Sequence, residues 1–135
     1  MTDTTLLNIT NLSISLPAGA ERPLAVDHVS LAVKPGEITC IVGESGSGKS
    51  MIAKAVLDIL PGRGIKVASG AIQLNGEDLV LSSADEMRKV RGARISMIFQ
   101  EPMTALNPLI RIGDQIAEVL EEHTDLPAKE RQKKC

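Results

Sequence analysis

The chain has 135 residues, of which 43% are hydrophobic and 24% are charged, and its formal net charge at pH 7 is −2. This length and composition allow a single domain with an apolar core, whereas the acidic balance gives no basic surface field for nucleic acid. No apolar run approaches the roughly 18 residues of a membrane-spanning helix, and the N-terminus lacks the basic and apolar regions of a secretory signal, so we expect a cytoplasmic protein.

Cysteine and histidine offer no pattern for a metal centre or a disulfide framework. Cys40 lies in an apolar run, where we expect a buried thiol, and Cys135 is the last residue. His28 and His123 have no cysteine, carboxylate or histidine at metal-ligand spacing. We therefore expect each histidine to lie at the surface or to be hydrogen bonded.

Alternating apolar residues predict two half-buried strands in the first part of the chain. The alternating positions are Leu12, Ile14 and Leu16 in the first strand and Val29, Leu31 and Val33 in the second. These strands are joined across Pro17 to Pro23, and the expected pairing is antiparallel. A turn at Lys34-Pro35-Gly36 then leads into the next segment.

That segment contains the strongest signal in the sequence, a phosphate-binding P-loop. It fits the pattern Gly-x4-Gly-Lys-Ser/Thr without a mismatch over the residues Gly43, Glu44, Ser45, Gly46, Ser47, Gly48, Lys49 and Ser50. Its glycines let the backbone take positive φ angles, so that successive N–H groups point inward and bind an anion. We expect Lys49 to reach the β- and γ-phosphates of a nucleotide and Ser50 to offer its hydroxyl to Mg²⁺.

The residues on either side support that interpretation. Residues 37–42 are short, apolar and β-branched, which predicts a strand buried on both faces. After the loop, apolar residues recur at helical spacing until Pro61-Gly62, at Ile52, Ala55, Val56, Ile59 and Leu60. The N-terminus of this helix adds its dipole to the anion site. A chance glycine-rich turn is the disfavoured alternative, because strand, loop and helix follow in the required order.

Turns and short elements follow. We expect residues 61–70 to be irregular, residues 71–74 to form a strand and Asn75-Gly76 to form a turn. Ser83 and Glu86 have the spacing of a capping box, which predicts a short helix through Met87 and Val90. Basic residues near its end are interpreted as solvated side chains rather than a nucleic-acid patch, because no aromatic residues lie between them. These residues are Arg88, Lys89, Arg91 and Arg94.

The last part of the chain predicts one more buried strand and one amphipathic helix. We expect residues 95–99 to form the strand, with Gln100 at its carboxyl end. In a P-loop domain, a polar side chain at the carboxyl end of a parallel strand lies near the bound phosphates. A glutamine carbonyl oxygen can bind Mg²⁺ or a water molecule while its amide donates elsewhere. Leu126-Pro127 ends the helix, and residues 129–134 form a charged tail. The apolar face of the helix, interpreted as packing surface, is Ile112, Ile116, Val119 and Leu120.

At this point the chain resembles the ATP-binding subunits of ABC transporters. The P-loop, the β-rich stretch that ends at Lys34-Pro35-Gly36-Glu37, and Gln100 as the glutamine of the Q-loop occur in that family's order. Within the family, residues 97–108, Met-Ile-Phe-Gln-Glu-Pro-Met-Thr-Ala-Leu-Asn-Pro, are similar to the dipeptide, oligopeptide and nickel importer group, as are residues 91–95. The resemblance extends from about Leu6 to His123.

The resemblance implies an α/β fold of the P-loop NTPase type, an ABC-type nucleotide-binding domain that is incomplete in this chain. Residues 1–36 would be mainly antiparallel β, residues 37–100 the P-loop core up to the Q-loop, and residues 101–135 the start of a helical subdomain. The cofactors would be ATP and Mg²⁺, with the metal held by Ser50 and Gln100. The partners would be membrane-spanning permease subunits, a second ATP-binding subunit and, indirectly, a substrate-binding protein, at the cytoplasmic side of the inner membrane, with no nucleic acid.

Family elements that complete catalysis do not occur in this sequence. There is no Leu-Ser-Gly-Gly-Gln-type signature and no apolar run followed by Asp-Glu, and His28 precedes the P-loop, so it cannot be the switch histidine. We therefore expect a fragment that binds ATP without efficient hydrolysis, folds poorly alone and cannot close the family's dimer. By the resemblance, Gln100 would couple the nucleotide site to the membrane-spanning subunits and position a water molecule. Without Tyr or Trp, adenine would meet only aliphatic groups near residues 23–26.

The sequence leaves other functions open. The main alternative is a truncated, non-catalytic module that binds nucleotide or a permease without turnover. An ABC-type ATPase acting on DNA is disfavoured by the acidic balance, and a small GTPase or kinase by the absence of an Asn-Lys-x-Asp motif. The transported solute also stays open among dipeptides, oligopeptides, glutathione-like peptides and nickel complexes.

Overall fold

The computed structural model describes residues 5–101 and 106–135 and divides into two compact units, Met1–Met87 and Arg88–Cys135. The first unit contains the sheet and the P-loop, and the second contains Gln100 and the C-terminal helices. Residues 102–105 of the importer-like segment lie outside the described residues. Among the residues that are described, no helix has the length and apolar character needed to cross a membrane.

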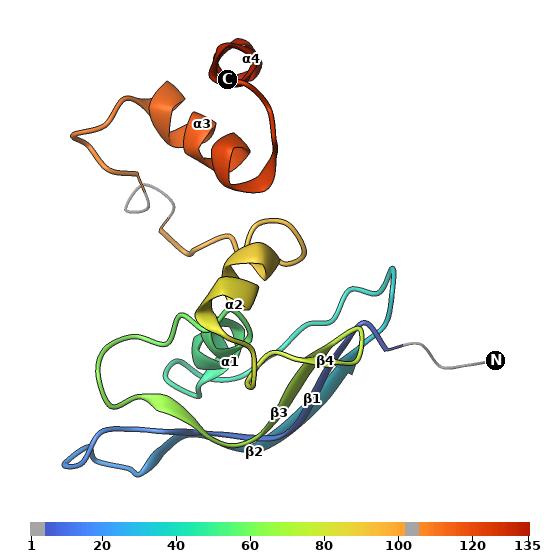
Figure 1. The fold of residues 1–135 in the computed structure, drawn as a ribbon. Helices are drawn as coiled ribbons and strands as arrows, with labels where there is room; N and C mark the ends of the chain where they lie inside the picture. The colour runs from blue at the N-terminus through green and yellow to red at the C-terminus, as the bar shows by residue number, and fades with distance from the viewer. Residues whose placement is uncertain (1–4, 102–105) are drawn as a thin grey trace. The chain divides into compact units, whose positions relative to one another are not determined.

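The first unit is built on a four-stranded sheet in which the strand order is β2-β1-β3-β4 (Figure 1). Its strands are β1 (Leu7–Ser15), β2 (Leu24–Val33), β3 (Lys66–Leu74) and β4 (Glu77–Asp78). All neighbouring strands are antiparallel. The predicted antiparallel pair is therefore confirmed as β1 and β2. Their connection closes where the Leu16 N–H donates to the Pro23 carbonyl at 2.9 Å.

Apolar side chains of β1 lie in the core of this unit, although register shifts interrupt their alternation. Ile9, Leu12 and Ile14 are at most 1% exposed, and Ile72 of β3, the register partner of Ile9, is 0% exposed. Burial of each such side chain contributes about 1.5–3 kcal/mol relative to leaving it in water. The apolar core of this unit is thus built largely on the central strands β1 and β3.

Strand β3 begins at Lys66, so the expectation of an irregular stretch over residues 61–70 is wrong for its second half. A register shift lies opposite Gly70, which has a φ of +93°. A Cβ at this position would lie 2.5 Å from the carbonyl oxygen of Asn11, so only glycine fits. The shift opposite Gly70 has its extra residue in β1, and a second shift, between Ser13 and Ile14, has its extra residue in β3. The second shift interrupts the alternation of β3, so the period that marks a strand is not visible in its sequence.

Both predicted turns of the first unit are confirmed. Asn75 and Gly76 have φ values of 50° and 84°, as a type I′ turn requires, and they join the paired residues Leu74 and Glu77. At the other turn, the Glu37 N–H donates to the carbonyl of Lys34 at 3.2 Å.

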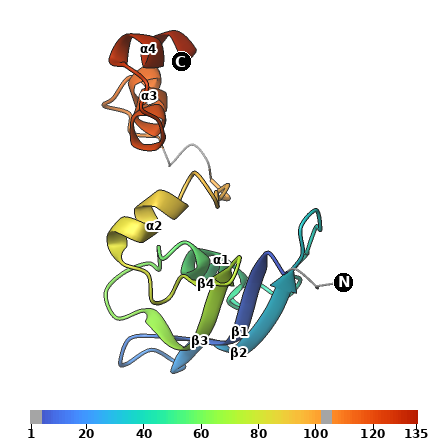
Figure 2. The same cartoon turned by 45° about the vertical axis from the view of Figure 1, so that its right-hand side comes forward.

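Helix α1 (Lys49–Val56) lies over one face of the sheet and contacts β2 and β3 (Figures 1 and 2). Three of its predicted apolar positions, Ile52, Ala55 and Val56, are buried. The apolar stripe read from the sequence therefore faces the core of this unit and fixes which side of the helix packs.

The helix ends earlier than predicted, before Ile59 and Leu60, because the chain turns at Asp58 with a φ of 51°. The Ile59 N–H donates to the Lys54 carbonyl at 2.9 Å, and the Asp58 N–H donates to the Ala55 carbonyl at 3.0 Å. These two bonds are those of a Schellman motif, which satisfies carbonyls that the helix end leaves without partners.

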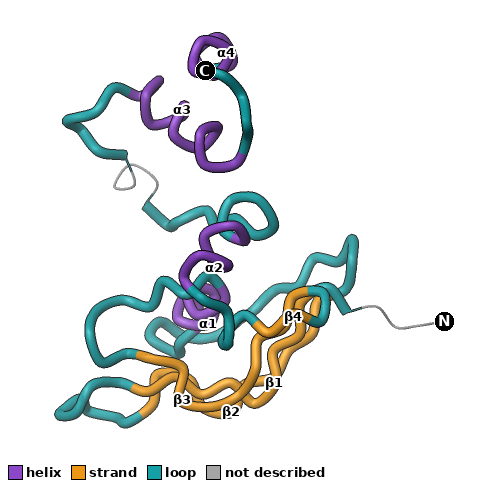
Figure 3. The backbone as a smooth tube through the Cα atoms, in the orientation of Figure 1, coloured by secondary structure: helices purple, strands orange, loops and turns teal. Residues whose placement is uncertain are grey.

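The two buried strands expected at residues 37–42 and 95–99 are wrong. Both segments are drawn as loop in Figure 3. Ile38 and Val42 are 91% and 92% exposed, and Cys40 is exposed too, so the expected buried thiol is also wrong. A strand needs a hydrogen-bonded neighbour, and none of the strands formed by the described residues pairs with either segment. Apolar character alone is therefore not enough to bury them.

Helix α2 (Ala84–Val90) begins with the predicted capping box. The Ser83 hydroxyl accepts from the Glu86 N–H at 3.3 Å, and the Glu86 carboxylate accepts from the Ser83 N–H at 2.7 Å. Met87 and Val90 are buried, as their spacing predicts. The predicted helix is confirmed with both of its apolar anchors.

The second unit contains α3 (Ile112–His123) and α4 (Ala128–Lys134), which contact each other. The predicted amphipathic helix is confirmed as α3, and Leu126-Pro127 separates it from α4. The interpretation of its apolar face as packing surface is wrong, because Ile112, Ile116 and Val119 are 63%, 46% and 58% exposed and no residue of α3 is buried. The predicted charged tail, residues 129–134, lies within α4. Arg131 connects α4 to the preceding residues. Its guanidinium donates to the Leu126 carbonyl at 3.1 Å and lies 3.2 Å from the Glu121 carboxylate.

Basic residues near the end of α2 and His28 lie at the surface, as the sequence predicts. Arg88, Lys89 and Arg94 are exposed, as solvated basic residues should be. His28 is exposed, and its Nδ1 lies 2.5 Å from the Asp27 carboxylate. His123 is half-buried in the second unit.

Candidate nucleotide-binding site

The P-loop, residues 43–50, runs directly into the N-terminus of α1. Gly46 and Gly48 have φ values of 78° and 92°, and Gly48 is the N-cap residue of the helix. The Ser47 N–H donates to the Glu44 carbonyl at 3.3 Å, which closes a turn within the loop. The left-handed glycines curl the backbone of the loop, which is the geometry that the motif predicts for an anion-binding site.

Strand β2 packs directly against the P-loop at Gly48. A Cβ on Gly48 would lie 2.6 Å from the Ala25 carbonyl oxygen and 3.0 Å from a methyl carbon of Val26. Ala25 and Val26 are themselves buried. The third glycine of the motif is therefore required for close packing of loop against strand as well as for its φ angle.

The N-terminus of α1 has the features of an anion site. No side chain caps it, and no acidic residue lies in its first turn. The first N–H groups of a helix have no acceptor within the helix, and the helix dipole makes this end positive. A phosphate group placed here would accept from those N–H groups.

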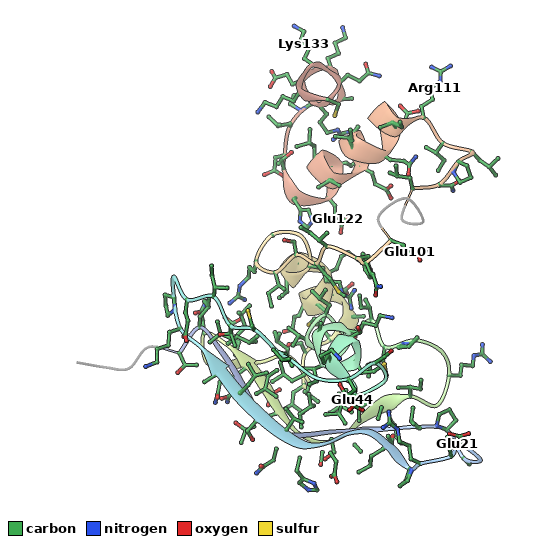
Figure 4. The ribbon with its side chains drawn as sticks, turned by 180° about the vertical axis from the view of Figure 1, so that it is seen from behind. Glu21, Glu44, Glu101, Arg111, Glu122 and Lys133 are labelled. Atoms are coloured by element: carbon green, nitrogen blue, oxygen red, sulfur yellow. The ribbon has the colours of Figure 1, made fainter. Side chains whose placement is uncertain are left out.

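Lys49 lies across its own loop. Its Nζ donates to the carbonyl oxygens of Gly43 and Glu44 at 2.8 and 2.6 Å and to the Ser47 hydroxyl at 3.1 Å. Figure 4 labels Glu44 beside the end of α1. The ammonium group is thus already held inside the curled loop, by neutral oxygen atoms that a phosphate can replace.

The two predicted magnesium ligands belong to different units. Ser50 is exposed in the first turn of α1, next to Lys49. Gln100 is exposed in the second unit, after the segment where the expected strand is not formed. The structure brings Gly43 to Ser50 together as one loop, whereas the joint role of Ser50 and Gln100 stays a prediction.

One residue that contacts the P-loop, Arg22, could not be recognised from the sequence. The Arg22 guanidinium, from the connection between β1 and β2, donates to the Gly46 carbonyl oxygen at 2.7 Å. Arg22 precedes Gly46 by 24 residues and belongs to no motif. Only the folding of the hairpin brings it to the P-loop.

A family model described as ABC transporter matches residues 26–134, which is more than half of the chain. This chain belongs to the ABC transporter family. The matched residues include both the P-loop and Gln100.

Relatives within the ABC transporter family carry names of peptide transporters. The chain is 46% identical over 125 residues to the "Peptidoglycan transport ATP-binding protein YejF" of Agrobacterium fabrum, covering 93% of this chain and 23% of that protein. It is 40% identical over 131 residues to the "Oligopeptide transport ATP-binding protein AppD" of Bacillus subtilis, covering 97% of this chain and 40% of that protein. The chain thus spans at most 40% of the length of these two relatives.

Solved structures of the same family share the fold. The ATP-binding cassette MJ0796, described as a dimeric post-hydrolysis state bound to ADP and Pi, superposes with a TM-score of 0.73 at 25% identity. That match covers 94% of this chain and 53% of the solved chain. The α/β fold of an ABC-type nucleotide-binding domain, expected from the resemblance, is confirmed.

Proposed function

We propose that this chain supplies the nucleotide-binding site of an ATP-binding subunit in an ABC importer, which couples ATP binding and hydrolysis to uptake of peptides or a related small solute. The observation that carries the proposal is the curled P-loop with Lys49 held inside it at the N-terminus of α1. The names of the relatives YejF and AppD, which describe peptidoglycan and oligopeptide transport, support the class of solute.

Binding of ATP would proceed by exchange of hydrogen-bond partners at Lys49. The ammonium group leaves the Gly43 and Glu44 carbonyls and donates to oxygens of the β- and γ-phosphates. A phosphate oxygen carries negative charge, whereas a carbonyl oxygen is neutral, so the ammonium group is attracted more strongly to the phosphates than to the loop carbonyls. The N–H groups of the loop and of the first turn of α1 donate to the same phosphate chain.

The cofactor in this proposal is the magnesium complex of ATP. Ser50 and Gln100 would hold the ion through a hydroxyl and an amide carbonyl, both hard oxygen ligands of the kind Mg²⁺ accepts. The ion neutralises charge on the phosphates. Because Gln100 would lie at the γ-phosphate, loss of that phosphate would change the preferred position of its segment, and this movement is what the importer would use.

The partners in this proposal are membrane-spanning permease subunits and a second ATP-binding subunit, with a substrate-binding protein acting indirectly. Exposed apolar side chains in the second unit support a protein partner there, among them Leu109, Ile112 and Val119. The protein would then lie peripherally at the cytoplasmic side of the inner membrane.

Hydrolysis needs a residue that polarises the attacking water. The 135 residues contain no apolar run followed by Asp-Glu, the segment that supplies this residue in the family. We therefore propose that this chain by itself binds ATP without turnover. Phosphate release from the chain in the presence of Mg·ATP tests this statement, and sustained release would refute it.

The nucleotide site is tested by equilibrium binding of Mg·ATP to the intact protein and to its Lys49→Ala variant. Removal of at least two charge-assisted hydrogen bonds, each about 1.5–3 kcal/mol, predicts an affinity at least 100-fold weaker. Lys54→Ala is the matched control, because Lys54 lies in the last turn of the same helix. Equal ATP affinity in the wild type and Lys49→Ala would refute the proposed site.

A further inference from the structure

The contact between Arg22 and Gly46 is not explained by the nucleotide motif. Arg22 lies in the connection between β1 and β2, and its guanidinium donates to the Gly46 carbonyl oxygen at 2.7 Å. Figure 4 labels its neighbour Glu21 in this connection and Glu44 in the P-loop. A positively charged side chain from outside the motif is therefore anchored on the backbone of the loop.

The direction of the Gly46 carbonyl determines the direction of the next N–H group. In a planar trans peptide the carbonyl oxygen and the N–H point to opposite sides. With the Gly46 carbonyl turned toward Arg22, the Ser47 N–H points the other way, into the loop, where it donates to the Glu44 carbonyl at 3.3 Å. That carbonyl also accepts from Lys49 at 2.6 Å. The Ser47 N–H and the Lys49 ammonium therefore share one side of the loop.

The loop needs such a support, because glycine-rich backbone rotates easily. Gly46 has a φ of +78°, and nothing lies within 4 Å of the position of a Cβ there. The peptide between Gly46 and Ser47 is therefore held by its two hydrogen bonds, from Arg22 to its carbonyl and from its N–H to Glu44, rather than by side-chain packing at Gly46. Glycine populates positive and negative φ almost equally, so the 46–47 peptide has alternative orientations in which the Ser47 N–H points away from the site. A hydrogen bond to the Gly46 carbonyl favours one of them.

We propose that Arg22 is a positioning residue of the nucleotide site, which holds the peptide between Gly46 and Ser47 with its N–H group turned toward the bound phosphates. This inference rests on the proposed function of the P-loop. A ligand binds more weakly when only a fraction of the protein has the competent conformation, and the apparent affinity falls by that fraction. Loss of one exposed hydrogen bond to a charged donor predicts an affinity about fivefold weaker.

The experiment measures equilibrium binding of two probes, Mg·ATP and inorganic tripolyphosphate, to the intact protein. Arg22→Met removes the donor and the charge. Arg22→Lys keeps a charged donor that can reach the same carbonyl. Arg63→Met is the charge-matched control, since Arg63 is an exposed arginine in another loop of the same unit. Arg22→Leu, which also removes the donor and the charge, replaces Arg22→Met if that variant is insoluble.

We expect Arg22→Met to lower the affinity for both probes by the same factor of about five. The affinities of Arg22→Lys should remain within about twofold of the wild-type values, and those of Arg63→Met should equal them. Weaker ATP binding with unchanged tripolyphosphate binding would overturn the proposal, because Arg22 would then act on the nucleoside. Unchanged binding of both probes, or an Arg22→Lys variant as weak as Arg22→Met, would overturn it as well. If the wild type binds neither probe, the proposed function fails instead.

Discussion

Replacement of Gly48 by alanine tests how the P-loop is held against the sheet. An alanine at a φ of 92° lies in the left-handed region, which costs an L-residue about 1–2 kcal/mol. Its Cβ would also lie 2.6 Å from the Ala25 carbonyl oxygen and 3.0 Å from a methyl carbon of Val26. Because the closest atom belongs to the backbone of β2, the strand or the loop must move, at a cost of about 1–3 kcal/mol.

Together these effects predict that Gly48→Ala lowers the free energy of unfolding by about 2–5 kcal/mol. Gly46→Ala is the matched control, because its φ is 78° but nothing lies within 4 Å of its Cβ position, so it carries the backbone strain alone. The measurement is the urea midpoint of each variant of the intact protein at constant slope, together with its ATP affinity.

The difference between the two variants isolates the close approach of the loop to β2. We expect Gly48→Ala to be the less stable of the two by about 1–3 kcal/mol and to bind ATP more weakly. If Gly48→Ala is no less stable than Gly46→Ala, the packing of Gly48 on Ala25 is not as described, and β2 does not support the loop.

Other substitutions test separate parts of the chain. Ser83→Ala removes the capping box of α2 and should lower the free energy of unfolding by about 1 kcal/mol, whereas Ser83→Asp should restore most of it, as thermal unfolding would show. Gly70→Ala places a Cβ 2.5 Å from the Asn11 carbonyl oxygen and should lower the urea midpoint clearly; an unchanged midpoint would mean that the bulge adapts. Gln100→Ala should reduce transport-linked ATP hydrolysis in the intact protein more than ATP binding, and equal losses would argue against a coupling role.

Much of the first unit could be predicted from the sequence, because its signals are local. Alternation in β1 and β2, the Asn75-Gly76 turn and the Ser83 capping box each depend on a few neighbouring residues. The P-loop conformation also follows from local chemistry, since its glycines permit the curl and Lys49 can only reach back over it. These features need little information about the rest of the chain.

The features that could not be predicted depend on distant partners. Residues 37–42 and 95–99 have the composition of buried strands, but burial requires neighbouring strands that the sequence pattern does not specify. The start of β3 is hidden by the register shift opposite Ser13 and Ile14, which depends on the pairing with β1. The Arg22 contact similarly requires the hairpin connection to fold back onto the loop.

The hydrogen bonds of Lys49 bear on which anions we expect the P-loop to bind. Its ammonium group already has three oxygen acceptors, all of them neutral, at 2.6 to 3.1 Å. An incoming ion must therefore offer better acceptors than the loop's own carbonyls before the lysine releases them. A chloride ion or a single carboxylate offers little advantage, whereas a polyphosphate chain presents several charged oxygens at once. We therefore expect polyphosphates to be the anions that bind this loop most tightly, with Lys49 donating to their oxygens.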